Sequence, residues 1–157
     1  MKKLDVTGSK LCTYQAQIFL QSVYLDCSSK VFLRRFFKSS FSQQLDHYNE
    51  HIFSFDTKDC FQSIVEQFGQ SSYGTKKINS DILYWLGYIT RYICYTRNYS
   101  SRKLYKNISI YHLIDNYEVY HTQNEEWVIK RILEYSGNDE SMFDKNILIK
   151  KILHHLW

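Results

Sequence analysis

Proline is absent from the 157 residues, and glycine occurs only five times. Tight turns and hairpins depend on these two residues, whereas helices are interrupted by them. The scarcity of both disfavours a β-rich fold and favours uninterrupted helices. The sequence also lacks any repeat, linker or low-complexity tract, so we expect a single domain over residues 1–157.

Closely spaced cysteines are missing too. Cys12, Cys27, Cys60 and Cys94 lie far apart in the sequence, whereas a zinc knuckle or a redox motif needs pairs two to four residues apart. We therefore expect four buried, free thiols, and we expect no metal and no cofactor.

No apolar run approaches the roughly 20 residues that cross a bilayer. The longest, residues 82–89, ends at Thr90 and Arg91, and the first ten residues carry no apolar stretch behind their lysines. A secretory signal would need such a stretch. These features predict a cytoplasmic protein with no membrane partner.

What the sequence does contain is apolar material at helical spacing. Hydrophobic residues make up 44% of the chain and aromatic residues 17%, including fourteen Tyr and ten Phe. A chain of this length buries about 70% of its unfolded surface, which is enough for a stable core without disulfide bonds or structural metal ions. The sequence predicts an all-α, single-domain bundle of about seven helices around a central helix at about residues 81–96.

The periodicity places the expected helices along the chain. One helix is expected over about residues 11–26. A second begins after a cap at Ser28 or Ser29, and a short continuation holds Phe41 and Leu45. The others are expected at residues 57–69, 81–96, 101–106, 109–120, 125–136 and 141–157. Alternation over residues 14–20 leaves a strand possible there. An extended connection is expected at residues 51–55.

Two local features have functional or packing meaning. Residues 70–75, rich in Ser and Gly, form the clearest loop and the best candidate for a functional loop. Gly87, in the middle of the central helix, costs about 1 kcal/mol relative to Ala. Its presence predicts that a neighbouring backbone approaches closely.

Charge is distributed unevenly. Residues 76–106 hold seven basic side chains and one acidic one, whereas residues 107–144 hold two basic and eight acidic ones. The two segments either pair inside the fold or face a partner, and we favour internal pairing because fields of this size are common.

Catalytic patterns are not recognisable. His47 and His51, four residues apart, are the only credible metal pair, and they lack a third ligand. No Gly-rich phosphate loop, nucleophile elbow or supported Cys/His pair is present. We therefore predict that the chain is not an enzyme and has no catalytic residues.

Residues 96–106 join the central helix to shorter ones, as in helix-turn-helix DNA-binding proteins. The helix that would enter the DNA groove, residues 109–120, carries Asp115 and Glu118. The negative charges of these side chains would be repelled by the DNA phosphates. A nucleic-acid-binding regulator using residues 76–106 is therefore the alternative and not the leading hypothesis.

A set of short motifs resembles a family of small proteins from low-GC Gram-positive bacteria and their mobile elements. They are Ser71-Ser72-Tyr73-Gly74, Leu83-Tyr84-Trp85-Leu86-Gly87-Tyr88, Arg91-Tyr92, Tyr95-Thr96, Ser100-Ser101, Leu104-Tyr105-Lys106 and Tyr120-His121-Thr122. The resemblance covers about residues 56–136. The resemblance implies that the chain is an antitoxin-like partner of a toxin. For some members of the family the toxin resembles an ADP-ribosyltransferase. The resemblance assigns no site residues to this chain.

The leading hypothesis is a non-enzymatic antitoxin or immunity-type protein that covers the surface of a protein partner, such as a toxin encoded next to it. Such a role needs shape and anchor residues but no reactive group. The residues predicted to contact the partner are Tyr73, Arg91, Tyr95, Arg97, Tyr99, Arg102, Tyr105 and His121.

Overall fold

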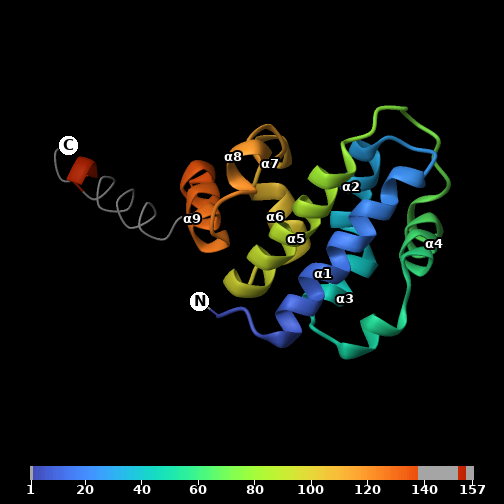
Figure 1. Cartoon of the computed structure of the whole chain (residues 1–157), viewed down its shortest axis with the longest axis horizontal. Coiled ribbons are helices and arrows are strands. Elements are labelled where there is room, and N and C mark those ends of the chain that lie inside the picture. Colours follow the sequence, from blue (N-terminus) through green and yellow to red (C-terminus); the bar gives the residue numbers. More distant parts are fainter. Residues whose placement is uncertain (1, 138–151, 155–157) are drawn as a thin grey trace. The chain divides into compact units, whose positions relative to one another are not determined.

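The computed structural model describes residues 2–137 and 152–154, and every regular element in these ranges is helical. The predicted all-α fold is confirmed (Figure 1). Contacts divide the chain into two compact units, Met1–Lys106 and Asn107–Trp157. The expectation of a single domain stays a prediction, and each unit is described by itself.

The first unit contains six α-helices and two short 3-10 helices in its described part. They are α1 (Val6–Gln21), η1 (Ser22–Tyr24), α2 (Ser29–Lys38), α3 (Ser40–Asp46), η2 (Glu50–Ser54), α4 (Thr57–Phe68), α5 (Ser80–Arg97) and α6 (Ser101–Asn107). Figure 1 shows α1 and α5 side by side and running in opposite directions. This pair is the axis of the unit, as expected for a central helix near residues 81–96.

Gly87 lets the backbones of α1 and α5 approach each other. A Cβ atom built on Gly87 would lie 2.8 Å from the Cα of Ala16, 2.8 Å from the carbonyl oxygen of Gln15 and 3.0 Å from the ring of Phe19. Two of these neighbours are backbone atoms, which cannot rotate away. The predicted close approach at Gly87 is confirmed.

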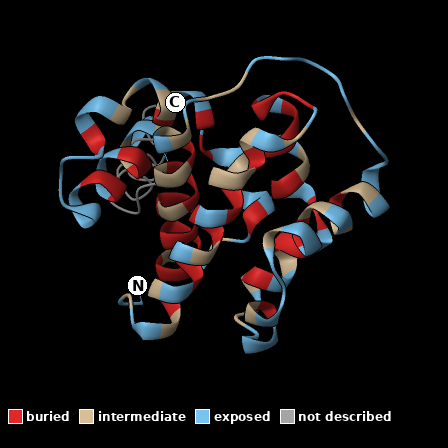
Figure 2. Ribbon diagram, turned by 45° about the vertical axis from the view of Figure 1, so that its right-hand side comes forward, coloured by how far each residue is buried: buried red, intermediate tan, exposed pale blue. Residues whose placement is uncertain are grey.

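Aromatic rings from α1 and α2 form the centre of the core. Phe19 makes edge-to-face contacts with Phe32, Phe36 and Phe37, with ring centroids 5.6, 4.9 and 5.8 Å apart. All four rings are at most 1% exposed. Figure 2 shows buried residues gathered where the helices face one another, and exposed residues along the loop before α5.

Several helix ends follow the sequence signals. Ser28 caps α2 by accepting a hydrogen bond from the Val31 amide, and Asp56 and Asp59 form a capping box at the start of α4. Asn79 caps α5, because its side chain accepts a hydrogen bond from the Asp81 amide at 2.8 Å.

The start of α1 was predicted too late. The helix begins at Val6 and not near residue 11, because the Asp5 side chain accepts a hydrogen bond from the Gly8 amide at 2.8 Å. It also ends at Gln21, before the expected residue 26. The alternative of a strand over residues 14–20 is wrong.

The extended connection predicted at residues 51–55 is also wrong. The segment Glu50–Ser54 is a 3-10 helix that Asn49 caps through the His51 amide. One turn suffices to bury Ile52, which is 2% exposed. It also sets the Phe53 ring edge-to-face with Tyr14 at 5.6 Å.

The second unit contains α7 (Ile110–Asp115), α8 (Tyr117–Tyr120) and α9 (Glu125–Ser136) in its described part. The bounds of α9 match the predicted range 125–136, and Asn124 and Gly137 cap its two ends. The single helix predicted over residues 109–120 is divided at Asn116, because the side-chain amide of Asn116 donates to the His112 carbonyl oxygen at 2.8 Å.

The helix predicted over residues 141–157 lies outside the described residues, apart from helical residues 152–154. Across the described parts of the chain, no helix is both long enough and apolar enough to cross a membrane.

We predict that Gly87→Ala destabilises the first unit although alanine favours helix. The gain in propensity is about 1 kcal/mol, whereas overpacking against a fixed backbone costs about 1–3 kcal/mol. Urea denaturation followed by circular dichroism should show a net loss. Thr13→Ala, at an exposed position of α1, is the matched control. A Gly87→Ala protein as stable as the wild type would contradict the close contact.

Candidate docking surface

Arg91, on α5, is fully buried, with 0% of its side chain exposed. Its Nε donates to Oε1 of Gln15 at 2.8 Å, and its Nη1 donates to Oδ1 of Asp46 at 2.7 Å. Its Nη2 donates to Oγ of Ser101 at 2.8 Å. The guanidinium therefore connects α1, α3, α5 and α6.

The groups around Arg91 also bind one another. The Ser101 hydroxyl and amide both donate to Asp46, at 2.8 and 3.1 Å to Oδ1. Nε2 of Gln15 donates to the Gly87 carbonyl oxygen at 3.0 Å and to Oγ1 of Thr90 at 2.9 Å. In the described parts of the chain, every buried side-chain polar atom has a partner.

Burial removes two of the predicted contact residues from the surface. Arg91 is occupied by the polar network, and Tyr95 is only 2% exposed. The Tyr95 hydroxyl donates to Oδ1 of Asp5 at 2.7 Å, and Nζ of Lys2 lies 4.0 Å from its ring centroid. These contacts hold the N-terminal residues against α5, so Arg91 and Tyr95 have a structural role.

The loop between α4 and α5, residues 69–79, is fastened to the start of α2. The Ser28 amide donates to the Tyr73 carbonyl oxygen at 3.0 Å, and the Ser29 amide donates to the Lys76 carbonyl oxygen at 3.1 Å. Nζ of Lys77 donates to the carbonyl oxygens of residues 25 and 27. The loop is therefore held in one conformation.

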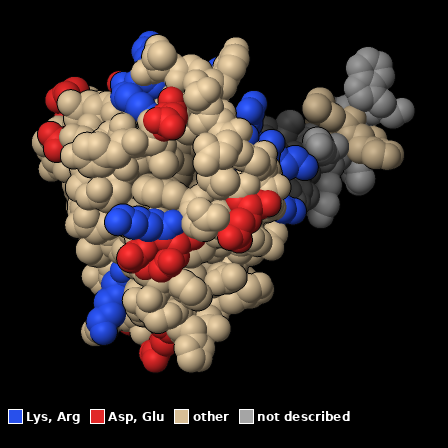
Figure 3. Space-filling view, turned by 90° about the vertical axis from the view of Figure 1, so that its right-hand side faces the viewer, with Lys and Arg blue, Asp and Glu red and all other residues tan. Residues whose placement is uncertain are grey.

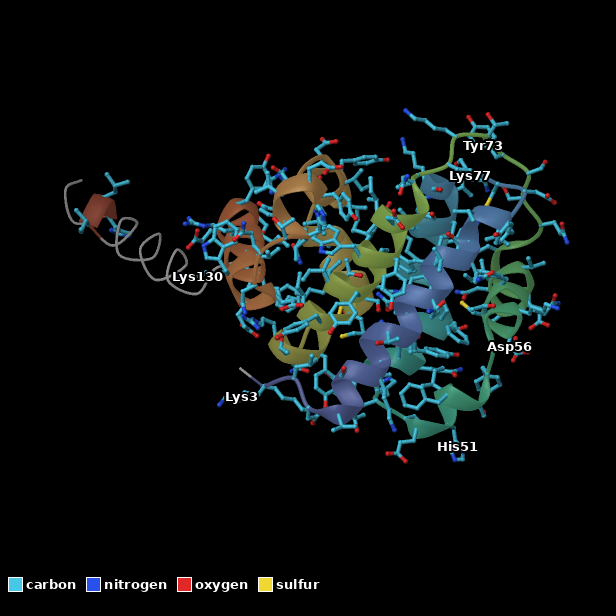
Figure 4. All side chains as sticks on the ribbon, viewed as in Figure 1. Lys3, His51, Asp56, Tyr73, Lys77 and Lys130 are labelled. Carbon is cyan, nitrogen blue, oxygen red and sulfur yellow. The ribbon has the colours of Figure 1, made fainter. Side chains whose placement is uncertain are left out.

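Tyr73 projects from this fastened loop (Figure 4). Its side chain is 80% exposed, although its backbone is bound to α2. Gly74 follows with a φ of +76°, and a Cβ atom there would lie 2.8 Å from the Cβ of Ser28. The predicted loop is confirmed, and Tyr73 is far more exposed than the buried Arg91 and Tyr95.

A hollow of about 200 Å³ lies beside the loop. Of its lining residues, Phe32 and Ile64 are buried and form an apolar floor, whereas the exposed Asp26 and the half-buried Arg35 lie toward the rim. Its lining residues are Tyr24, Leu25, Asp26, Cys27, Phe32, Arg35, Phe61, Ile64, Val65, Gln70 and Ser71. Pockets that enclose drug-sized ligands measure roughly 300–1,000 Å³, so this hollow suits a single side chain.

Sequence reasoning missed two residues at this hollow. Tyr24, which is 82% exposed, lies on its rim. Arg35 donates to the Gly69 carbonyl oxygen at 2.6 Å and so fixes the start of the loop. The exposed Tyr24 ends η1 beyond the last buried turn of α1, and that break in periodicity is the signal that could have identified it.

The other predicted contact residues do not join Tyr73. Arg97 and Tyr99 are half-buried at the end of α5, and Nη1 of Arg97 donates to Oγ1 of Thr96 at 2.9 Å. Tyr105, on α6, stacks on Phe37 with centroids 5.4 Å apart. Arg102, exposed, donates to the Lys38 carbonyl oxygen at 3.0 Å.

His121 belongs to the second unit. It is exposed, stacks on the ring of Tyr117 at 4.3 Å and donates from Nδ1 to the Tyr117 carbonyl oxygen at 2.6 Å. Of the eight predicted residues, Arg91 and Tyr95 are buried, so the eight do not form one exposed surface.

The basic segment 76–106 is partly used inside the fold. Arg91 forms an ion pair with Asp46, which is not part of the acidic segment 107–144. Lys77 donates hydrogen bonds to backbone carbonyl groups. On the face shown in Figure 3, basic and acidic side chains lie beside one another. The seven basic residues of the segment are therefore not one surface.

His112 is the centre of a polar cluster in the second unit. Its ring stacks on Tyr135 with centroids 3.6 Å apart, and Nε2 lies 3.1 Å from the Tyr120 hydroxyl. The amide nitrogen of Asn116 lies 3.2 Å from Nδ1. Because an amide nitrogen only donates, Nδ1 accepts and Nε2 carries the proton of the neutral ring. Desolvation by burial lowers the pKa of His112, although Asp115 opposes the shift.

The four cysteines are free and buried, as expected. Burial raises the pKa of Cys12 and of Cys94 to about 12, although Arg91 opposes both shifts. Thiols with such pKa values carry almost no thiolate at pH 7.

Metal-binding groups of three or more His, Cys, Asp or Glu side chains are not found among the described residues. His51 lies on η2, at the opposite end of the first unit from Tyr73 (Figure 4).

Comparison of the chain with protein-family models, with curated proteins and with solved structures finds no match. The resemblance to antitoxin-like proteins therefore stays a prediction.

We predict that Arg91→Met destabilises the first unit by about 3–5 kcal/mol, because the carboxylate of Asp46, which is only 12% exposed, loses its counterion. Urea denaturation measures the loss. Adding Asp46→Asn should recover part of it, since the unpaired charge is removed. Arg131→Met, which breaks the exposed pair with Glu134, is the control and should cost less than about 1 kcal/mol. An equal loss in the two single variants would refute the role of burial.

We predict that acidification weakens the second unit through His112. Its folded pKa lies below the unfolded value of 6.5, so the unfolded state binds more protons as pH falls below 6.5. The stabilisation is complete above pH 6.5 and is lost as pH falls through the folded pKa. Thermal unfolding from pH 7 to pH 5 should therefore decline less steeply for His112→Phe than for the wild type.

The control for the acidification experiment is His47→Gln, an exposed histidine of the first unit. It should follow the wild-type profile. A titration of the His112 ring protons that gives a pKa of 6.5 or higher would contradict the prediction.

Proposed function

We propose that this chain is a non-enzymatic, cytoplasmic protein-binding factor of the antitoxin or immunity type, which neutralises a partner by covering its surface. The observation that carries the proposal is the fastened loop 69–79 with the exposed ring of Tyr73. Four free cysteines accord with a reducing compartment.

Rigidity supports a binding role for the loop. An interface residue that is disordered before binding loses conformational freedom when the complex forms, and this loss weakens affinity. Ser28, Ser29 and Lys77 fix the loop backbone in advance. The Tyr73 ring is therefore presented to a partner at a small entropic cost.

The chemistry of the surface around the loop also supports this role. Tyrosine is enriched at binding hot spots because it combines a large apolar ring with a polar tip. Tyr73 is on the loop, Tyr24 is on the rim of the hollow, and the floor beneath includes Phe32 and Ile64. A partner side chain inserted into the hollow would be flanked by polar groups at the rim.

The binding partner to test first is the product of the neighbouring gene. Tyr73→Ala should weaken the complex at least tenfold, because truncation of a hot-spot tyrosine costs about 2 kcal/mol or more. Isothermal titration calorimetry with both purified proteins measures the change. Tyr73→Phe, which keeps the ring, should bind nearly as the wild type does.

A matched control for the calorimetry is Tyr111→Ala, an exposed tyrosine on α7 that is 54% exposed. It should leave the affinity unchanged. Failure to form a complex with either adjacent gene product would count against the proposed function. A complex that tolerates Tyr73→Ala would instead show that the loop is not its anchor.

A further inference from the structure

Exposed basic side chains occur on two adjoining helices, α2 and α6. Lys30, Arg34 and Lys38 occupy every fourth position of α2, and all three are exposed. Residues at this spacing lie on one face of a helix. Eight residues of helix span about 12 Å at 1.5 Å per residue, so these three cations extend along most of α2.

Two hydrogen bonds bring further basic residues next to the two ends of α2. At the C-terminal end, Arg102 donates to the Lys38 carbonyl oxygen at 3.0 Å, which brings α6 with its exposed Lys103 and Lys106 next to Lys38. At the N-terminal end, the Ser29 amide donates to the Lys76 carbonyl oxygen at 3.1 Å. We call this surface the basic stripe: Lys76, Lys30, Arg34, Lys38, Arg102, Lys103 and Lys106.

Acidic residues are absent from the two sequence segments that supply most of the stripe. No Asp or Glu occurs in residues 27–45 or in residues 82–114. Lys38 and Lys103 lie over tyrosine rings, with Nζ 5.9 Å from the centroid of Tyr105 and 4.0 Å from that of Tyr99. A ring beneath a cation leaves the positive charge intact, so the stripe offers an extended positive potential.

We propose that the basic stripe binds the phosphate backbone of single-stranded RNA without sequence preference. This function goes beyond the proposed protein binding and, apart from Lys76 of the loop, uses residues of α2 and α6. Interfaces with nucleic acids are much more positive than interfaces with proteins. The core of a protein interface is depleted of lysine, so seven exposed cations on adjoining segments fit a polyanion better than an acidic protein.

The helices that carry the basic side chains determine how the protein would contact RNA. A helix-turn-helix mode needs an intact recognition helix, but residues 109–120 are divided into six-residue and four-residue helices at Asn116. The stripe uses α2 and α6 in place of that helix. Contacts between these cations and phosphates carry no base readout, so binding through them depends on backbone charge and not on sequence.

The test is fluorescence anisotropy of the full chain with a labelled 20-nucleotide oligouridylate, from about 50 to 200 mM salt. Each cation lost from a single-strand contact reduces the salt slope by about 0.7. Arg34→Gln/Lys38→Gln should therefore reduce the slope by about 1.4 and weaken binding about tenfold or more at low salt. Lys103→Gln/Lys106→Gln should do the same through α6.

The matched control is Lys10→Gln/Lys58→Gln, which removes the same charge from exposed positions on α1 and α4. It should keep nearly all of the affinity. Circular dichroism should show that all three variants remain folded, and the two stripe variants serve as independent checks if one of them unfolds.

Three results would overturn the proposal. The first is the absence of binding at 50 mM salt, and the second is an equal loss in the control and in both stripe variants. The third is equal or tighter binding of poly-glutamate, or of vesicles containing phosphatidylserine, than of the oligouridylate. The tenfold loss confined to the stripe variants, with weaker binding of both other polyanions, is the supporting outcome.

Discussion

The fold of the first unit depends on the burial of one charged side chain, Arg91. A guanidinium without water is stable only when acceptors surround it, and Gln15, Asp46 and Ser101 supply these from three other helices. Gln15 reaches Arg91 because Gly87 lets α1 approach α5 closely. Gly87 and Arg91 therefore act together, and the hydrogen bonds of Arg91 fix the positions of α1, α3, α5 and α6.

This arrangement separates the interior from the surfaces that face solvent. Arg91 and Tyr95 belong to the interior, although their residue types suggest contact with a partner. The hydrogen-bonded loop 69–79 and the exposed cations of α2 and α6 lie outside the core. The first surface offers an aromatic ring and a small hollow, and the second offers charge, so they suit partners of different chemistry.

Sequence periodicity predicted the elements that local chemistry determines. The helical class, the bounds of α9 and the packing role of Gly87 follow from patterns within a few residues. The break at Asn116 and the 3-10 helix at residues 50–54 could not be predicted in this way. Both depend on a side-chain amide whose choice of backbone partner is decided in the folded chain.

The candidate surfaces were harder to predict because they combine distant segments. The hollow joins residues from η1 to the loop after α4, and Arg102 meets the end of α2 across 64 positions of the sequence. The fastened loop has a consequence for how this protein can vary. Since Ser28, Ser29, Lys77 and Gly74 fix its register, its length is constrained, and an inserted residue would displace Lys77 from its carbonyl groups. Recognition of a new partner would therefore arise by exchange of side chains at this loop and not by its lengthening.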